Sequence, residues 1–191
     1  MSVSNPYTSG NFPNTFVQDS KGFVQGSYAA DAVAKNFLVA GKIASTETLP
    51  MWGGVAIQEL MAATEGTINT IKRAVSYATC TGFSVSAQTY NALVTTDNTV
   101  PVVPVGADCQ FFRLGSGVRL YLPIDPALDL TTLQIGAAVS FDFTTGQIVE
   151  FDTTALAVKV LSVIQNSLIV SYDALTGNAT WATGAVAEVE I

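Results

Sequence analysis

Short stretches in which apolar and polar residues alternate recur along most of this chain. In VSFDFTTGQIVEF, residues 139–151, every second side chain is apolar up to Phe143, and apolar residues resume at Ile148 after the sequence TTG. Successive side chains of a β-strand point to opposite faces, so the pattern predicts two strands that turn back on each other at Thr144 to Gly146. From Phe37 onward the pattern is mainly β, and after EGTINTIKRAVSY, residues 65–77, similar stretches recur at intervals of about ten residues, with turn residues between most of them. The sequence therefore predicts a mainly β protein, with residues 37–191 forming a small β-barrel or jelly-roll-like sandwich.

Two further stretches carry the signals of hairpins. RLGSGVRLYL predicts a hairpin that turns at Gly115 to Gly117, because glycine supplies the positive φ that tight turns require. VKVLSVIQNSLIVSY predicts another hairpin, which turns at Gln165 to Ser167, where asparagine tolerates a positive φ. We expect both to be wall elements of the same β-domain.

A glycine pair and one ambiguous segment complete the local predictions. Gly53 and Gly54, in PMWGGVAIQEL, predict a bulge or a close approach of another backbone segment. In EGTINTIKRAVSY, the spacing of Ile68, Ile71 and Val75 is helical, so at most one short helix is expected, and it would lie here.

Residues 1–36 differ from the rest of the chain. They are rich in Ser, Asn, Gly and Pro, and neither a helical nor a strand period links their aromatic residues. A polar segment of this kind would be disordered by itself, yet its aromatic side chains are a large apolar load to leave in water. We expect an extended N-terminal arm whose aromatics anchor in grooves of a neighbour or of the chain's own core, the alternative being an unanchored tail. The predicted partner contacts are Tyr7, Phe12, Phe16, Phe23, Tyr28 and Trp52.

The charge content points toward assembly. Charged residues make up 12% of the chain, about half of the usual share of roughly 25%. A surface of small neutral groups costs little to desolvate, so it suits burial against other protein, whereas it keeps a free monomer poorly soluble. We expect an assembly component, with a weakly charged monomer as the alternative.

The charges are also unevenly placed. Residues 120–191 carry eight acidic side chains and one basic one, Lys159, which accounts for the whole net charge of −7. Nucleic acid is not expected as a partner, because binding it requires clustered basic residues and the longest basic run is Lys72-Arg73. The neutral half is expected to contact a partner, and the acidic half to face water.

The first residues, MSVSNPYTSG, lack the basic start and the apolar run of a secretory leader. No apolar stretch reaches the ~18–20 residues of a membrane helix. We therefore expect synthesis in a cytosol and no membrane partner. Thiols stay reduced in that compartment, so Cys80 and Cys109 are expected to be two buried thiols rather than a disulfide.

The residues needed for common catalytic chemistry are sparse. The chain has no histidine, which removes the usual general base and the commonest zinc ligand. The carboxylates of Asp125, Asp129, Asp142 and Glu150 show neither the grouping of a glycosidase pair nor that of a calcium loop. We expect no enzymatic activity, no cofactor and no metal, and an enzyme acting through carboxylates such as Asp125 is the least favoured alternative.

The C-terminal part resembles a known family. GSGVRLYLPIDPALDLTTLQIGAAVSFDFTTGQIVEF, with the closing WATGAVAEVEI, resembles the capsid cement (decoration) proteins of tailed bacteriophages. The matching elements are Gly115 to Leu122, Ile135-Gly136 with Val139 to Ile148, and Gly184 to Ile191. Where that family usually has a charged residue after the glycine, this chain has Ala137. The arm followed by PMWGGVAIQ is similar to the layout of the N-terminal parts of such proteins.

This resemblance implies a structural virion protein that binds the outside of an icosahedral shell. It would lie at junctions between major capsid proteins, as a homodimer or homotrimer, after synthesis in the cytoplasm of a bacterial host. The alternative function is a ligand- or glycan-binding β-domain of a phage surface or tail component. That role would require exposed aromatic side chains, for which Trp52 and Trp181 are the candidates.

Overall fold

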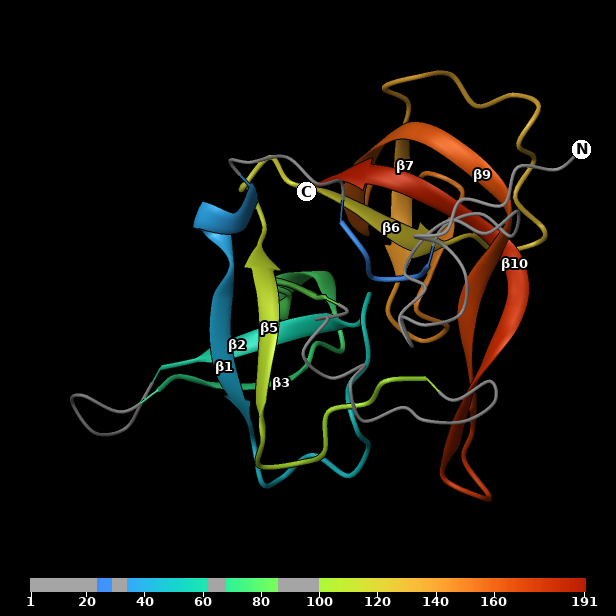
Figure 1. Ribbon diagram of the computed structural model, residues 1–191. Helices are drawn as coiled ribbons and strands as arrows, with labels where there is room; N and C mark the ends of the chain where they lie inside the picture. The colour runs from blue at the N-terminus through green and yellow to red at the C-terminus, as the bar shows by residue number, and fades with distance from the viewer. Residues whose placement is uncertain (1–23, 29–33, 62–67, 86–99) are drawn as a thin grey trace, which may run out of the picture.

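The computed structural model describes residues 24–28, 34–61, 68–85 and 100–191. These residues form ten strands and two 3-10 turns, η1 (Ala34–Phe37) and η2 (Tyr77–Thr79), and they contain no α-helix. The prediction of a mainly β protein is confirmed, and the strands form two separate sheets that lie side by side (Figure 1).

The first sheet is a closed five-stranded barrel. Its strands follow the order β1 (Val39–Ile43), β3 (Thr70–Arg73), β2 (Ala56–Leu60), β4 (Gly82–Ser84) and β5 (Asp108–Arg113). β1 and β3 are parallel, and the other neighbours are antiparallel. Closure leaves the barrel without a free edge. Its interior is filled by Ile43, Met51, Ile57, Ile71, Val103, Cys109 and Phe111.

The second sheet has the order β6 (Arg119–Pro123), β10 (Asn178–Glu190), β9 (Leu156–Asp173), β7 (Ala138–Asp142) and β8 (Gln147–Val149). It curls on itself: Ile124, next to β6, forms a parallel bridge with Ile148 of β8, and the N–H of Asp125 donates to the Ile148 carbonyl at 2.9 Å. The two edges therefore meet at one end of the sheet. In Figure 1 the long β9–β10 hairpin, in orange and red, curves away from this closed end to its turn.

The largest hydrophobic cluster belongs to both sheets. Phe83 of β4 and Phe112 of β5 contribute to it from the barrel, and Leu120, Leu122 and Phe141 contribute from the second sheet. The rings of Phe83 and Phe141 pack edge to face with centroids 5.0 Å apart. Burying a side chain of this size stabilises a fold by about 1.5–3 kcal/mol. The shared cluster therefore joins the two sheets into one body.

Residues 24–28, predicted as part of the arm, pack against both sheets, and we call this segment the strap. Gln25 is only 4% exposed, and its amide N–H donates to the Gly53 carbonyl at 3.1 Å. Its side-chain carbonyl accepts from the Val170 N–H at 2.8 Å. The strap backbone also exchanges hydrogen bonds of 2.7 and 3.0 Å with Tyr121 of β6. Since both ends of the buried amide are paired, the strap joins the segment before β2 to β6 and β9.

The hairpin predicted at residues 139–151 is confirmed, and the one predicted at Gly115 to Gly117 is wrong. The stretch 139–151 forms the β7–β8 hairpin, with Phe141 opposite Ile148 and Gly146 at φ +72° in its turn. The glycines at 115 and 117 do have positive φ, but β5 and β6 belong to different sheets and do not pair. The glycine turn therefore passes the chain from the barrel to the second sheet. Alternating apolar residues show that the stretches on either side of the glycine turn are strands. The alternation does not show which strands are neighbours in a sheet.

The hairpin turn predicted at Gln165 to Ser167 is also wrong. β9 continues through this point to Asp173, and the chain reverses at residues 174–177. Ser167 pairs with Gly184, whereas Ile164 pairs with Val186, so β9 contains one residue more than β10 here. The extra residue is accommodated by a bulge in which Asn166 takes φ +57°. The positive φ expected of asparagine is present, but it bends the strand instead of ending it.

The segment around Ile71, where a short helix was expected, forms strand β3. Ile71 lies in β3 and is buried, whereas Ile68 and Val75 lie outside the strand and are exposed. Their helical spacing does not correspond to one apolar face. The close backbone approach expected at the Gly53-Gly54 pair is confirmed, because a Cβ atom on Gly26 of the strap would collide with the backbone of Gly53.

Replacing Gly26 should separate the cost of this collision from the cost of backbone strain. Gly26 has φ +74°, and Gly115 has φ +79° with no described atom within 4 Å of the position that a Cβ atom would take. Gly115→Ala should lower the free energy of unfolding by about 1 kcal/mol through strain. Gly26→Ala should lower it by about 3 kcal/mol, because the added methyl also displaces the strap. Urea denaturation of both variants measures the difference. Equal decreases in the free energy of unfolding would show that the strap can move away from the added methyl without an energetic penalty.

Candidate functional site

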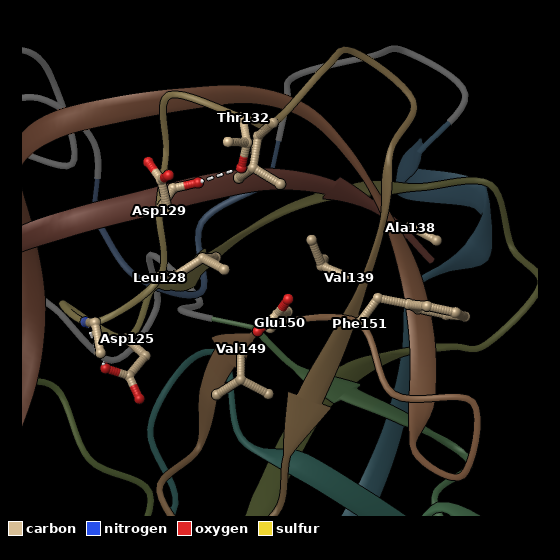
Figure 2. Close-up of a pocket in the computed structure, with 11 residues that line it drawn as sticks. Asp125, Leu128, Asp129, Thr132, Ala138, Val139, Val149, Glu150 and Phe151 are labelled. Carbon is tan, nitrogen blue, oxygen red and sulfur yellow. Dashed lines mark hydrogen bonds between the residues drawn. The ribbon is translucent and has the colours of Figure 1, made fainter.

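A cavity of about 630 Å³ opens beside β7 and β8, under the loop that follows β6. Figure 2 shows Asp125 and Asp129 on that loop and Glu150 on the segment after β8, around apolar side chains that include Leu128 and Phe151. Three of the four carboxylates considered for chemistry from the sequence lie here: Asp125, Asp129 and Glu150. The cavity is therefore the first place to examine for a reactive site.

The aspartates of this cavity are held by their own loop. The Oδ1 atom of Asp125 accepts from the Ala127 N–H at 2.8 Å. The Oδ1 atom of Asp129 accepts from the N–H and the hydroxyl of Thr131 at 2.9 and 2.7 Å. Each carboxylate thus fixes the turn that starts at its own residue. Asp142, the last residue of β7, does not line the cavity.

The same arrangement recurs in three other turns of the second sheet. In each, an aspartate accepts from a backbone N–H two residues later and from a threonine hydroxyl two or three residues later, at 2.7–2.9 Å. The acceptors are Asp142, Asp152 and Asp173, and the donors are Thr144, Thr145, Thr154, Leu175 and Thr176. Much of the acidic excess of the C-terminal half therefore stabilises turns.

These hydrogen bonds favour the ionised carboxylates. The hydrogen bond from the Thr131 hydroxyl lowers the pKa of Asp129, and the N–H of Thr144 lowers the pKa of Asp142. A general acid requires a raised pKa near the working pH. The direction of these shifts suits a structural role and does not suit proton donation.

A second recess, of about 450 Å³, lies between the barrel and the second sheet, and we call it the groove. Trp52, predicted as a partner contact, lines it and is half-buried. The guanidinium carbon of Arg73 lies 4.5 Å from the centre of the Trp52 ring. The Tyr172 ring stacks on Trp52 with a centroid distance of 5.3 Å and an interplanar angle of 28°.

The sequence did not single out Arg73 or Tyr172 as site residues. Arg73 follows Ile71 and Lys72 in β3, and Tyr172 lies near the end of β9, so neither is near Trp52 in the sequence. The available signal was weak: Lys72-Arg73 is the longest basic run in an acidic chain. Only the packing of β9 beside the barrel brings the three side chains together.

The other predicted contact residues divide into two groups. Tyr28 packs its ring edge to face on Phe112 of β5, with centroids 5.2 Å apart, and its backbone pairs with Leu120 of β6. It is thus anchored in the chain's own core, which is one of the two anchoring modes expected. The remaining residues lie outside the described part of the chain: Tyr7, Phe12, Phe16 and Phe23.

Both cysteines are free thiols, with Cys109 buried and Cys80 half-buried. Burial raises the pKa of Cys80 to about 11 and that of Cys109 to about 12. Nucleophilic cysteines require a lowered pKa, so neither thiol is activated. Among the described residues, His, Cys, Asp and Glu form no group of three that could hold a metal ion.

Comparison with known protein families, with curated proteins and with solved structures finds no match for this chain. No helix in the described ranges has the length and apolar character required to cross a bilayer.

The turn aspartates should make stability depend on acid pH. The pKa values of Asp129, Asp142, Asp152 and Asp173 are lowered from an ordinary value of 3.8. The folded protein then binds these protons more weakly than the unfolded chain does. Their stabilisation is complete above the unfolded-state pKa and is lost as the pH falls through the lower folded-state values. The free energy of unfolding, measured in urea from about pH 6 to about pH 2, should fall at the acid end.

Asp142→Asn is the matched variant for this prediction. Its side-chain oxygen can still accept from the Thr144 N–H, but the position no longer titrates. The variant should lose less stability than the parent between the two pH limits. Identical pH dependence in the two proteins would contradict the role assigned to Asp142.

Proposed function

We propose that this protein is a non-enzymatic structural protein that decorates the outer surface of a tailed-bacteriophage capsid and holds neighbouring major capsid subunits together. The observation that carries the proposal is the core shared by the two sheets, in which Phe83 packs on Phe141. One rigid body then presents two separate β-surfaces at a fixed distance from each other. A clamp that bridges two neighbours needs such a pair of surfaces.

Many weak contacts would add up on an assembled shell. A standard interface buries roughly 800 Å² on each partner. A protein that binds only the assembled lattice stabilises it by mass action, since binding favours the state that binds. The hydrogen-bonded ladders of the barrel and of the β9–β10 hairpin would transmit an outward pull between the two contact surfaces. As a homodimer or homotrimer, each decoration would engage several subunits at once.

Exposed apolar side chains support a contact role. Met61, Val75, Ile135 and Leu175 are 80–97% exposed, and they lie at strand ends and in loops of both sheets. Five aspartates of the second sheet and its loops, in contrast, are hydrogen-bonded within turns: Asp125, Asp129, Asp142, Asp152 and Asp173. Burying one of the exposed apolar side chains fully against a partner would contribute about 1.5–3 kcal/mol. Reactive groups are not gathered in a comparable way among the described residues.

The stretches that resemble capsid cement proteins fold together. Gly115 to Leu122 contains most of β6, Val139 to Ile148 contains most of the β7–β8 hairpin, and Gly184 to Ile191 covers the end of β10. All of these strands belong to the second sheet, so the resemblance follows one structural unit. This coherence supports the resemblance as a guide to function.

Two deletions test the arm as the capsid anchor. Deleting residues 1–23 removes the predicted anchors Tyr7, Phe12, Phe16 and Phe23 but keeps the strap, so we expect an unchanged urea midpoint and lost decoration of capsids. Deleting residues 1–28 also removes the buried Gln25 and should destabilise the fold. Cryo-EM occupancy on particles of the phage that encodes the chain is the measurement. Full occupancy by the shorter deletion would refute the arm as anchor, and a map without this chain outside the shell would refute the proposed function.

A ligand-binding β-domain of a phage surface or tail component is the second candidate. The groove favours it, because Trp52 and Tyr172 line a cavity large enough for a small ligand. Binding on a glycan array that disappears in Trp52→Ala or Trp181→Ala would support this candidate over capsid decoration. A protein that cements capsids should bind none of the glycans.

A further inference from the structure

The groove between the two sheets carries an unusual charge. Among the described residues that line it, Arg73 alone is charged, in a protein whose net charge is −7. The cavity beside β7 and β8, in contrast, is acidic, since its charged lining residues are Asp125, Asp129 and Glu150. A cationic recess on an acidic protein selects for ligands that carry a negative charge.

The donors of Arg73 are only partly satisfied. Its Nη2 atom donates to the Pro50 carbonyl at 2.6 Å, whereas its Nε atom is buried without a hydrogen-bond partner in the described part of the chain. The ion pairs among the described residues are Arg113–Glu59 and Arg119–Glu188, and neither includes Arg73. A buried guanidinium donor without an acceptor is costly.

Glu47 compensates this charge incompletely. Its Oε1 atom accepts from the backbone N–H of Arg73 at 3.1 Å and is thus bonded to the main chain rather than to the guanidinium. The pKa of Arg73 is lowered, with burial as the largest cause and Glu47 opposing it. A carboxylate in the groove would meet the one charged side chain among the described lining residues, and the described part of the protein supplies that guanidinium with no ion pair.

The walls of the groove suit a peptide. Trp52, Phe143 and Ile169 provide apolar surface, and Val75, which is 80% exposed, lies at its rim. The indole of Trp52 already contacts the Arg73 guanidinium and the Tyr172 ring, which leaves less of it for a sugar ring to stack on. An acidic side chain flanked by apolar ones matches this combination of one cation and apolar walls better than a glycan does.

We propose that the groove binds an acidic peptide segment of a partner protein, with an Asp or Glu carboxylate on Arg73 and flanking apolar side chains against Phe143 and Val75. The identity of the partner as a capsid subunit rests on the proposed function. The binding itself does not, because it can be measured without capsids.

Fluorescence of Trp52 provides the test. In Trp181→Phe protein, Trp52 is the single tryptophan, and it lies against the guanidinium that the carboxylate would bind. The probe is an acetylated, amidated pentapeptide of alternating Leu and Glu, and the control is the same peptide with Gln in place of Glu. We expect a saturable change with the acidic peptide that weakens as salt is raised, and none with the control. Equal responses to the two peptides would overturn the proposal.

Charge variants at the exposed rim keep the test independent of folding. Val75→Lys should tighten binding of the acidic peptide by about two- to five-fold, and Val75→Glu should weaken it by a similar factor. Arg73→Gln should abolish binding, whereas Arg113→Gln, which removes an arginine outside the groove, should not change it. Shifts of the two Val75 variants in the same direction would refute the electrostatic basis.

Two further measurements distinguish a peptide site from a glycan site, and peptide binding from capsid decoration. A tri-galacturonate that produces the saturable change while the acidic peptide does not would assign the groove to acidic glycans and overturn the peptide proposal. Peptide binding without any decoration of capsids would support the groove and refute the proposed function. Arg73→Gln protein that no longer decorates capsids, but remains folded, would support both.

Discussion

The packing of one sheet against the other is the constraint on which this structure depends. Phe83 and Phe112 face out of a small closed barrel, and they are covered by Leu120, Leu122 and Phe141 of the second sheet. A barrel with short strands has a limited interior, here only seven buried residues among those described, so much of its apolar surface must be buried elsewhere. Because the largest core cluster belongs to both halves, neither sheet is complete without the other.

Polar groups at the junction are satisfied by a segment far away in sequence. Gln25 of the strap connects Gly53, before β2, to Val170 of β9 through the two ends of one amide. A buried amide with one end unpaired would be costly, so the connection specifies a single arrangement of the three segments. Gly26 is required beside it, because a side chain there would collide with Gly53. The part of the chain that reads as a polar arm thus contributes to the core of the fold.

Charged side chains are few in this protein, and many of its aspartates stabilise the turns in which they lie. In the second sheet, aspartates such as Asp142 and Asp173 are hydrogen-bonded to the N–H and hydroxyl groups of their own turns. Much of the acidic charge of this half therefore stabilises the turns in which it lies. Arg73 differs, since its guanidinium lies in the groove against Trp52 and forms no ion pair with the described residues, although the Glu47 carboxylate accepts from its backbone N–H.

The sequence by itself determined most of the strands, though not β3, because the alternation of apolar side chains follows directly from the two-residue period of a pleated backbone. It also determined the β7–β8 hairpin and the positive φ of Gly115 and Asn166, which are properties of a few neighbouring residues. Tertiary structure decided which strands pair, and so a glycine turn became a crossing between sheets and an asparagine became a bulge. It also decided the groove, since Trp52, Arg73 and Tyr172 meet only when β9 lies beside the barrel. Such contacts depend on long-range burial, and no local pattern in the sequence encodes them.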